Sequence, residues 1–388
     1  MSWGIEDYGL FSSIGAGKTE TVENLFSKSR SGLSPIQLPN GKKTYAGIIN
    51  NELDQYPENL QDLKSRNNQL VYSIFKQIEP TFNSLKSRFQ NNKIGIVIGT
   101  STSGISDVET AFKMKEQSGK FPEDYHYKMH EMGSPAEFLA RLTGCEGPAY
   151  TVSCACSSGS KAMASAARLL ESEVCDLVIT GGVDTLCNLT LLGFNSLEVI
   201  SENPSLPFSQ NRDGINIGEA GALFLMTRNK CAYNLLGYGE SSDAYHHSAP
   251  HPEGEGAIAS MKSALKSAHL SELEIDYINL HGTGTLQNDS MEAKAVNDIF
   301  GPDIPCSSTK SLTGHTLGAA GAIEAAFALL ALEYQQLPVH HWDNLPDTSM
   351  PQLNLVSEPN PQNKINTVLS NSYAFGGNNC SIILGRNS

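Results

Sequence analysis

Residues 148–170 hold the feature that most limits the fold, a short apolar segment that runs directly into an alanine-rich segment. Residues 149–155 are small, β-branched or aromatic, which predicts a buried strand. From Ser157 onward the chain is rich in Ala, Met, Leu and Lys, which are good helix formers, and has no proline. The helix face that carries Gly159 and Ala166 is very small, so we expect a second helix to pack close against it. The sequence therefore predicts a strand–helix unit buried inside a larger protein.

Cys156 lies at the junction between this strand and this helix. Ser157 and Ser158 are suitable helix caps, and the free N–H groups at a helix N-terminus favour a thiolate. The arrangement is typical of a buried cysteine nucleophile. The alternative from these residues alone is a cysteine that only packs in the core, as most free cysteines do.

Length and charge limit the organisation and the partners of the chain. Its 388 residues suit two domains of similar size. The 27 basic and 41 acidic residues give a net charge of 27 − 41 = −14, which argues against a nucleic-acid partner. An anionic partner would require a local basic patch.

Cysteine usage and hydropathy indicate a cytoplasmic protein without a membrane span. The eight cysteines have neither a disulfide-framework spacing nor zinc-like intervals, which fits a reducing compartment. The first residues show no signal-peptide pattern. The most apolar run, residues 319–332, contains Glu324 and is too short to cross a bilayer. We expect it to be a buried helix, with a buried partner for Glu324.

The N-terminal region has two ambiguous features. Residues 15–19 resemble the end of a phosphate-binding loop, but Ser12 stands where that motif requires glycine and no clear strand leads into it. We therefore predict a turn that begins a helix at residues 20–26. The preceding residues are poor in strand formers, so a first strand is uncertain.

Residues 62–78 predict an amphipathic helix with Leu70 and Ile74 on its apolar face. Lys64 and Arg66 lie at the N-terminal end of this helix. Such a pair is usually only part of a solvated face. In a chain this acidic it is also a candidate docking site for an anionic partner.

The pattern of strands and helices occurs twice along the chain. A strand at 94–98, the central stretch and a strand at 176–180 predict a parallel sheet with both faces covered. After residue 229 the pattern begins again, and an alanine- and glycine-rich helix from Leu317 echoes the one after Cys156. We infer an internal duplication, with one half at residues 1–229 and the other at 230–388.

Four ordered blocks resemble the β-ketoacyl-acyl-carrier-protein synthases of the elongating, two-histidine kind. They are Cys156 at its strand–helix junction, the His-Gly-Thr-Gly-Thr of residues 281–285, the Lys-Ser-Leu-Thr-Gly-His of residues 310–315, and the Asn-Ser-Tyr-Ala-Phe-Gly-Gly of residues 371–377. The resemblance covers most of the chain, from about residue 95 to residue 385. Within this family the chain looks most like the ketosynthases of bacterial aryl-polyene pathways, through residues 66–70, 99–104, 193–198 and 248–256.

The resemblance implies an α/β thiolase fold, in which two similar halves with mixed sheets form five αβαβα layers. It also implies an acyl carrier protein that presents the substrate on a phosphopantetheine arm, with no other cofactor and no metal. The protein would form a homodimer, or a heterodimer with a related subunit or chain-length factor. The reaction implied is the decarboxylative condensation of malonyl-carrier protein with an acyl group held on the enzyme.

The resemblance also implies the roles of the catalytic residues. Cys156 would take the acyl group. His281 and His315 would donate hydrogen bonds to the malonyl thioester oxygen, and Lys310 would support His315 electrostatically. The backbone N–H groups of Cys156 and Phe375 would hold the second oxyanion.

The remaining site residues implied by the resemblance bind the substrate. Thr283 and Thr285 would bind the pantetheine amides, although both could merely satisfy the backbone of a turn. Phe194 would contact the substrate. Phe375 would act as a gate for the acyl chain, or else be a simple packing residue.

Two positions depart from the usual family pattern, and two other functions remain as alternatives. Ala374 stands where glycine is common and Asn378 where threonine is common. A non-catalytic chain-length partner subunit usually lacks the cysteine, so Cys156 argues against it. A degradative thiolase pairs its first cysteine with a late second one, but Cys380 does not lie in that motif.

Overall fold

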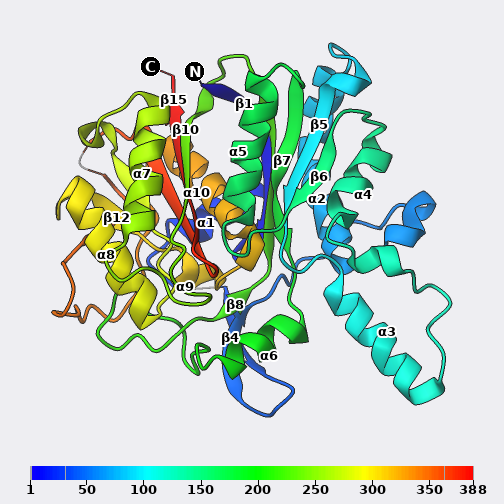
Figure 1. Ribbon diagram of the computed structural model, residues 1–388, viewed down its shortest axis with the longest axis horizontal. Helices are drawn as coiled ribbons and strands as arrows, with labels where there is room; N and C mark the ends of the chain where they lie inside the picture. Colours follow the sequence, from blue (N-terminus) through cyan, green and yellow to red (C-terminus); the bar gives the residue numbers. More distant parts are fainter. Residues whose placement is uncertain (1, 31, 362, 388) are drawn as a thin grey trace.

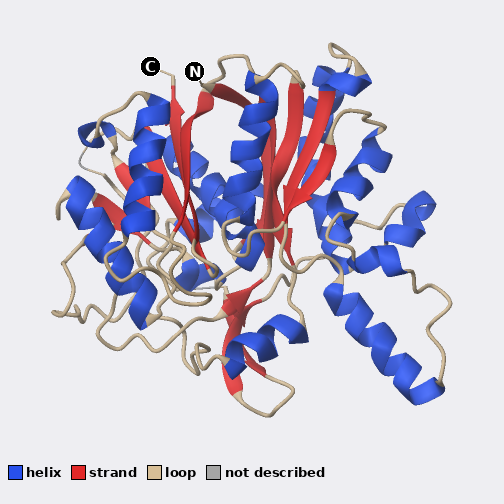
Figure 2. Cartoon of the chain, viewed as in Figure 1, coloured by secondary structure: helices blue, strands red, loops and turns tan. Residues whose placement is uncertain are grey.

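The structure is a computed structural model that describes residues 2–30, 32–361 and 363–387 of the chain. A long mixed sheet forms its framework (Figures 1 and 2). The strands of this sheet are β1 Trp3–Ser12, β2 Gly15–Ala16, β5 Ile94–Gly99, β6 Ala149–Val152, β7 Leu177–Asp184, β9 Ala220–Thr227, β10 Tyr233–Ser242, β11 Tyr277–Asn279, β12 Pro305–Ser307, β13 Asn354–Leu355, β14 Thr367–Ala374 and β15 Asn378–Arg386. A small second sheet contains β3 Leu33–Gln37, β4 Lys43–Gly47 and β8 Ile217–Gly218.

Apart from the short strand β13, the strand order of the long sheet is symmetric about the β1–β10 pair. The order is β13-β12-β11-β14-β15-β10-β1-β9-β7-β5-β6. From the central pair toward each edge, the strands follow the same sequence of antiparallel and parallel pairings. In one half β9 is antiparallel to both neighbours, and β7, β5 and β6 are parallel. In the other half β15 is antiparallel to both neighbours, and β14, β11 and β12 are parallel. This repeated order supports the internal duplication inferred from the sequence.

Helices cover the outer faces of both halves and fill the space between them. The helices are α1 Gly17–Leu25, α2 Arg66–Lys86, α3 Ile105–Ser118, α4 Ser134–Thr143, α5 Ser158–Glu171, α6 Asn188–Ser196, α7 Glu255–Ala268, α8 Leu286–Phe300, α9 Lys310–Thr313 and α10 Ala320–Tyr334. Helices α2 and α4 pack on the β5–β7–β9 side, α7 and α8 lie on the β10–β15 side, and α5 and α10 lie between the halves (Figure 1). The result is the five-layered αβαβα arrangement that the family resemblance implies, with the sheets of the two halves joined through the β1–β10 pair.

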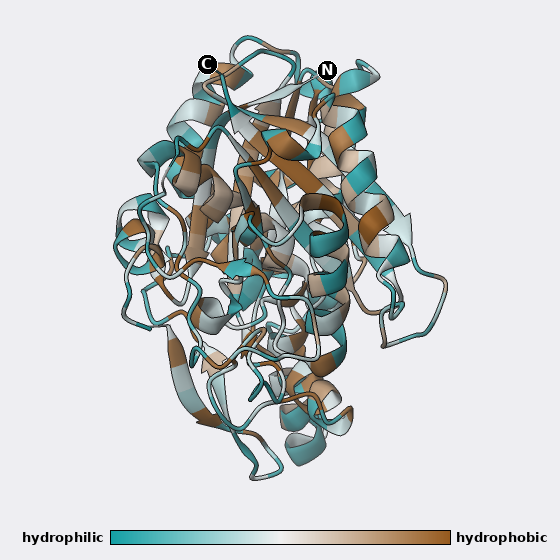
Figure 3. Cartoon of the chain, turned by 90° about the vertical axis from the view of Figure 1, so that its left-hand side faces the viewer, coloured by the Kyte–Doolittle hydropathy of each residue, from teal (hydrophilic) through white to brown (hydrophobic). Residues whose placement is uncertain are grey.

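The hydrophobic cores follow these layers, and apolar segments concentrate in the strands and inner helices (Figure 3). The largest core contains α5, α10 and the inner faces of strands from both halves. A second core lies beneath α2 and α4, and a third beneath α7 and α8. The run Leu317–Tyr334 has the length and hydropathy of a membrane span, but 89% of it is buried. It is therefore the central core helix, as the sequence predicted.

Helices α5 and α10 approach each other closely because their contact faces are small. A Cβ added at Gly159 of α5 would lie 2.7 Å from the backbone nitrogen of Ala322. A Cβ added at Gly321 of α10 would lie 2.0 Å from Oγ of Ser160. The small face predicted for the helix after Cys156 thus brings the two central helices together.

The N-terminal elements differ in part from the sequence prediction. The uncertain first strand is a full ten-residue strand, β1, because β9 and β10 pair with it on both sides. The turn at residues 15–19 does begin a helix, α1. The helix predicted at 62–78 begins at Arg66, since Ser65 caps it by accepting from the backbone N–H of Asn68, and it continues through Pro80 to Lys86.

Candidate active site

Cys156 lies on a sharp turn between β6 and α5. The preceding residue, Ala155, has a φ of 46°, a left-handed conformation that few residues with a Cβ adopt. Ser157 and Ser158 stabilise this turn, because their hydroxyls donate to the carbonyls of Cys154 and Ala155 at 2.9 and 2.6 Å. These local hydrogen bonds therefore stabilise the strained backbone conformation of Ala155. It presents the 5%-exposed Cys156 at the N-terminal end of α5.

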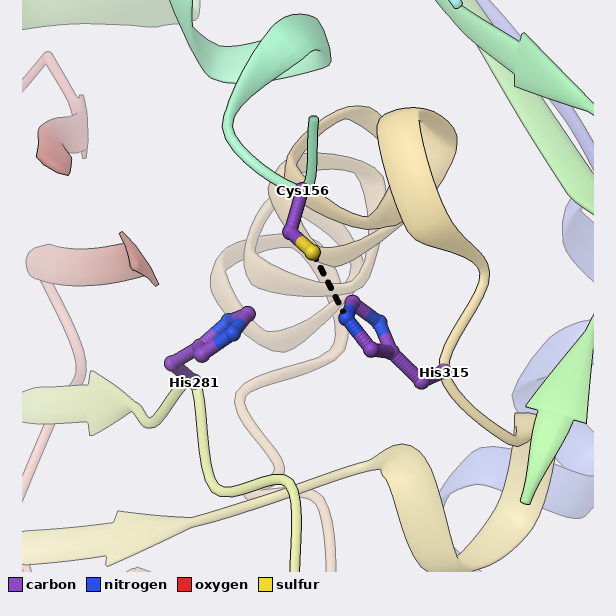
Figure 4. A group of neighbouring side chains, drawn as sticks. All are labelled: Cys156, His281 and His315. Atoms are coloured by element: carbon purple, nitrogen blue, oxygen red, sulfur yellow. Dashed lines mark hydrogen bonds between the residues drawn. The ribbon is translucent and has the colours of Figure 1, made fainter. Parts of the chain in front are cut away.

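Two histidines from the second half of the chain converge on Cys156 (Figure 4). Nε2 of His315 lies 3.0 Å from Sγ of Cys156. The ring of His281 meets the ring of His315 edge to face, with centroids 5.3 Å apart. The sulfur and one ring nitrogen from each histidine all lie within 4.8 Å of one another. All three side chains can thus contact one thioester.

The topology explains this convergence. The loops that carry Cys156 and His281 follow the parallel strands β6 and β11, and ligand sites in such sheets form beyond the carboxyl ends of strands. His315 precedes α10, which packs against α5. Because the two central helices approach closely, the residues before their N-termini meet.

Lys310 contacts His281 rather than His315. Its Nζ lies 3.4 Å from Nδ1 of His281 and 2.5 Å from Oε1 of Glu324, and the lysine is buried. The buried partner predicted for Glu324 is therefore Lys310. The predicted support of His315 by Lys310 is only a longer-range electrostatic effect, since the pKa of His315 is lowered mainly by burial and then by the Lys310 charge.

Burial sets the charge state of the site. It lowers the pKa values of His281 and His315 well below the ordinary range, and the nearby Lys310 charge lowers both further. Both imidazoles are therefore neutral near pH 7. Burial also raises the pKa of Cys156 to about 11, although Lys310 and the backbone N–H of Phe375 oppose this shift. Burial thus favours the thiol form of Cys156, against the thiolate expected from the helix N-terminus.

The neutral imidazoles act as hydrogen-bonding groups, and His281 has a fixed tautomer. An ammonium group beside Nδ1 of His281 donates to it, which leaves the ring proton on Nε2. Nδ1 of His315 has no partner among the described residues. One sulfur and two imidazole nitrogens at this spacing suggest a cation site, but the Lys310 charge and the Nε2 proton of His281 oppose one.

Sequence reasoning missed two buried carboxylates that shape the site. Both oxygens of Glu292 accept backbone N–H groups, from His281 and Gly282, at 2.7 Å each. Asp184, at the end of β7, accepts from the loop after β5 and from Gly318. Each carboxylate faces a glycine-containing turn that follows a strand. Its sequence position near such a turn was the signal that could have identified it.

The site opens into a cavity of about 420 Å³. Its walls include all four residues predicted to bind substrate, namely Phe194, Thr283, Thr285 and Phe375. The two threonine hydroxyls lie 3.0 Å apart, and that of Thr285 also caps α8 by accepting from the backbone N–H of Asn288. Thr285 therefore both satisfies backbone and lines the cavity, and its role in binding pantetheine stays a prediction.

The predicted gate residue Phe375 sits at the tip of a tight hairpin. Ala374 and Asn378 pair at its base, and Gly376 and Gly377 have φ values of 82° and 72°. These left-handed conformations favour glycine. The ring of Phe375 packs against Phe194 of α6, with centroids 5.7 Å apart. Two aromatic rings from separate elements thus meet at the cavity wall.

The two candidate docking residues have different environments. Lys64 is exposed. The guanidinium of Arg66 binds both oxygens of Glu219, at 3.1 and 2.5 Å, and this carboxylate is only 2% exposed. The charge of Arg66 is therefore used within the chain, which weakens its case as a docking residue.

Comparisons with known proteins match this geometry. Residues 81–231 match the family described as beta-ketoacyl synthase, N-terminal domain, and residues 233–341 match its C-terminal domain. A 3-oxoacyl-[acyl-carrier-protein] synthase 2 from Rhizobium meliloti is 34% identical over 75% of this chain and 74% of its own. The protein of the same name from Coxiella burnetii is 30% identical over 98% of both chains.

Solved structures are also similar over the whole chain. A ketosynthase (ApeO) in complex with its chain length factor (ApeC) from Xenorhabdus doucetiae gives a TM-score of 0.96 at 44% identity, covering 100% of this chain and 98% of that one. The ishigamide ketosynthase/chain length factor gives a TM-score of 0.88 at 26% identity, covering 100% and 99%.

Proposed function

The chain belongs to the β-ketoacyl synthase family, and from this premise we propose that it condenses malonyl-carrier protein with an acyl group held on Cys156. The observation that carries the proposal is the 3.0 Å contact between Sγ of Cys156 and Nε2 of His315, with His281 beside it. One nucleophile and two neutral imidazoles share one cavity. This set matches the chemistry of both half-reactions.

In the first half-reaction the sulfur of Cys156 attacks the acyl thioester of the carrier arm. Because the resting group is a thiol, its proton must leave as the C–S bond forms, and Nε2 of His315 is the acceptor within reach. The proton then passes to the departing sulfur of the arm. The backbone N–H groups of Cys156 and Phe375 stabilise the oxyanion formed on the acyl carbonyl.

In the second half-reaction malonyl-carrier protein loses carbon dioxide, and its enolate attacks the acyl-cysteine. Negative charge develops on the malonyl thioester oxygen. His281 donates to this oxygen through Nε2, since Lys310 occupies its Nδ1. His315 donates as well after its ring proton has moved from Nδ1 to Nε2. Acylation of Cys156 removes the thiol proton that faced Nε2, and among the described residues Nδ1 has no partner that would hold the proton there. The enolate carbon displaces the sulfur of Cys156 as a thiolate and releases the β-ketoacyl product. The thiolate then takes up one proton from water, which restores the resting thiol.

The cavity residues position the carrier arm and the acyl chain. Thr283 and Thr285 present hydroxyls for the pantetheine amides. Phe375 acts as a gate that must leave Phe194 before an acyl chain enters. We also propose the boundary between residues 229 and 230 as the division between the half that supplies Cys156 and the half that supplies both histidines.

The partners follow from the family and from the surface. We propose an acyl carrier protein as the substrate donor, with no other cofactor, and a dimer with a second copy or a chain-length-factor subunit. Strand β6 is the outermost strand on its side of the long sheet, and its Tyr150 is 36% exposed. Phe112 and Met114 are also exposed on the projecting helix α3 (Figure 1). An open strand edge and apolar side chains suit a partner subunit.

We place the enzyme in the cytoplasm and in aryl-polyene chain elongation. All eight cysteines are free, which suits a reducing compartment. The pathway rests on the resemblance of residues 66–70, 99–104, 193–198 and 248–256. The alternative, a non-catalytic chain-length subunit, would not require the convergence of Cys156, His281 and His315.

Acyl transfer from acyl-carrier protein, followed by intact-mass measurement, tests the proposal. We expect the wild-type chain to gain one acyl group, Cys156→Ala to gain none, and Cys154→Ala, its neighbour in the same turn, to gain one as usual. Both variants should unfold cooperatively on heating, with a midpoint close to that of the wild-type protein. An acyl adduct on the Cys156→Ala protein would place the nucleophile elsewhere and contradict the proposal.

A further inference from the structure

Asp184 is a completely buried carboxylate at the carboxyl end of β7, and the chemistry described above gives it no role. Its oxygens accept hydrogen bonds from five donors. They are the hydroxyl of Thr100 at 2.5 Å, the backbone N–H of Ser101 at 2.8 Å, the backbone N–H and hydroxyl of Thr102 at 2.9 and 2.8 Å, and the backbone N–H of Gly318 at 2.6 Å. Burial raises its pKa and these hydrogen bonds oppose that shift. The carboxylate is thus satisfied without a cation.

The donors come from both halves of the chain. Thr100, Ser101 and Thr102 follow β5 in the first half, whereas Gly318 lies in the second half, three residues after His315. The hydroxyl of Ser101 also donates to the carbonyl of Ala155, the strained residue before Cys156, at 3.2 Å. A short path of hydrogen bonds therefore runs from the Cys156 turn, through Ser101 and Asp184, to the loop after His315.

The packing around this path is tight. A Cβ added at Gly318 would lie 2.7 Å from Oδ2 of Asp184 and 2.7 Å from Oγ of Ser101. The loops therefore have little freedom to shift while the carboxylate remains in place. One of the two loops lies beneath the Cys156 turn, to which Ser101 is hydrogen-bonded, and the other follows His315.

We propose that Asp184 is a positioning residue that sets the separation of Cys156 and His315 by tying the loop beneath the Cys156 turn to the loop after His315. The expected effect of Asp184 on catalysis rests on the proposed function. Its effect on the distance between Cys156 and His315 does not depend on any activity. An error of about 1 Å in the position of reacting groups is enough to cost roughly 100-fold in rate.

The first test is structural and needs no substrate. A crystal structure of Asp184→Asn should show the Sγ–Nε2 distance between Cys156 and His315 lengthened beyond hydrogen-bonding range, because an amide cannot accept from both loops. Thr180→Val is the matched control, since Thr180 is a buried residue of β7 whose hydroxyl has no partner in the described part of the chain. If the Asp184→Asn structure keeps the 3.0 Å contact, the proposal is overturned.

The second test is a double-mutant cycle on the condensation rate. Asp184→Asn should lower kcat by about tenfold or more with little change in KM for malonyl-carrier protein, because reacting groups are displaced while the arm still binds. In a His315→Ala background the same change should have an effect of less than about threefold, since the residue it positions is gone. An undiminished loss in that background would mean that Asp184 acts only through general stability, and the proposal would be wrong.

Gly318→Ala provides a variant that keeps the carboxylate if Asp184→Asn does not fold. Its added Cβ separates the same two loops, so it should lengthen the same distance and lower kcat in the same way. A wild-type protein with no condensation activity would refute the proposed function but not the structural test. A normal Cys156–His315 distance in both variants would refute the positioning role but not the function.

Discussion

Lys310 and Glu324 form a buried ion pair in which Nζ lies 2.5 Å from Oε1 and neither side chain is more than 3% exposed. The same ammonium contacts His281, so the central helix α10 is coupled to a catalytic imidazole through this pair. The pair therefore has two separable consequences, one for stability and one for chemistry.

Removing one member of the ion pair should lower the free energy of unfolding strongly, whereas removing both members should lower it little. Glu324→Leu leaves a buried ammonium uncompensated, so we expect the free energy of unfolding to fall by about 3–5 kcal/mol. The double variant Lys310→Met with Glu324→Leu should recover most of that loss, yet condense poorly because Nδ1 of His281 has lost its donor. Urea unfolding and a condensation assay measure the two effects. Equal destabilisation of the single and double variants would contradict the coupling.

Glu292 should make stability depend on pH. Burial raises its pKa from 4.5 to about 7, although the backbone N–H groups of Gly282 and His281 oppose this shift. Between these values the native state keeps a proton that the unfolded state has released, so the contribution of Glu292 to stability falls as pH rises from about 4.5 to about 7. Glu292→Gln should flatten this decline, by up to about 3 kcal/mol across the window. Urea unfolding at pH 5 and pH 7 tests it, and an unchanged decline would count against the shift.

The two histidines should affect the two half-reactions differently. His281→Ala removes a donor that acts only during decarboxylation, so we expect condensation to fall by about 100-fold or more while self-acylation of Cys156 persists. His315→Ala should also lower condensation more than acylation, but should slow acylation too, because His315 contacts the thiol. Mass spectrometry of the quenched reaction measures acylation of Cys156, and the amount of β-ketoacyl product released measures condensation. Equal losses in both steps for His281→Ala would contradict its assigned role.

Much of the site could be predicted because its residues lie in short contiguous blocks. Cys156, His281 and His315 each adjoin a recognisable strand end or helix start. The local pattern of each block left alternatives open, and the resemblance of the ordered blocks to a family indicated the catalytic residues. The contacts between blocks could not be predicted. Whether Lys310 reaches His281 or His315 depends on the position of α9 relative to β11, and sequence spacing does not determine that position.

Other differences between the sequence prediction and the structure also arise from contacts between segments that are far apart in the chain. Strand β1 is weak in local strand signal but forms because partners on both sides complete its hydrogen bonds. Asp184 lies in an apolar strand that reads as core, and only the fold reveals the donors that gather around it. Arg66 reads as an exposed charge, because its partner Glu219 lies 153 residues further along the chain.

Lys64 and Arg66 should separate carrier-protein docking from stability. Lys64→Glu reverses an exposed charge, so if the carrier protein docks here through negative charge we expect it to bind more weakly, with an unchanged free energy of unfolding and a smaller difference at high salt. Arg66→Glu places a second acid beside the buried carboxylate of Glu219, and we expect it to destabilise the fold by about 1–3 kcal/mol. Binding by calorimetry and unfolding in urea, measured on both variants, resolve the two roles. If Lys64→Glu binds the carrier protein as tightly as wild type, this end of α2 is not a docking surface, and the acidic partner must find its positive charge on another face.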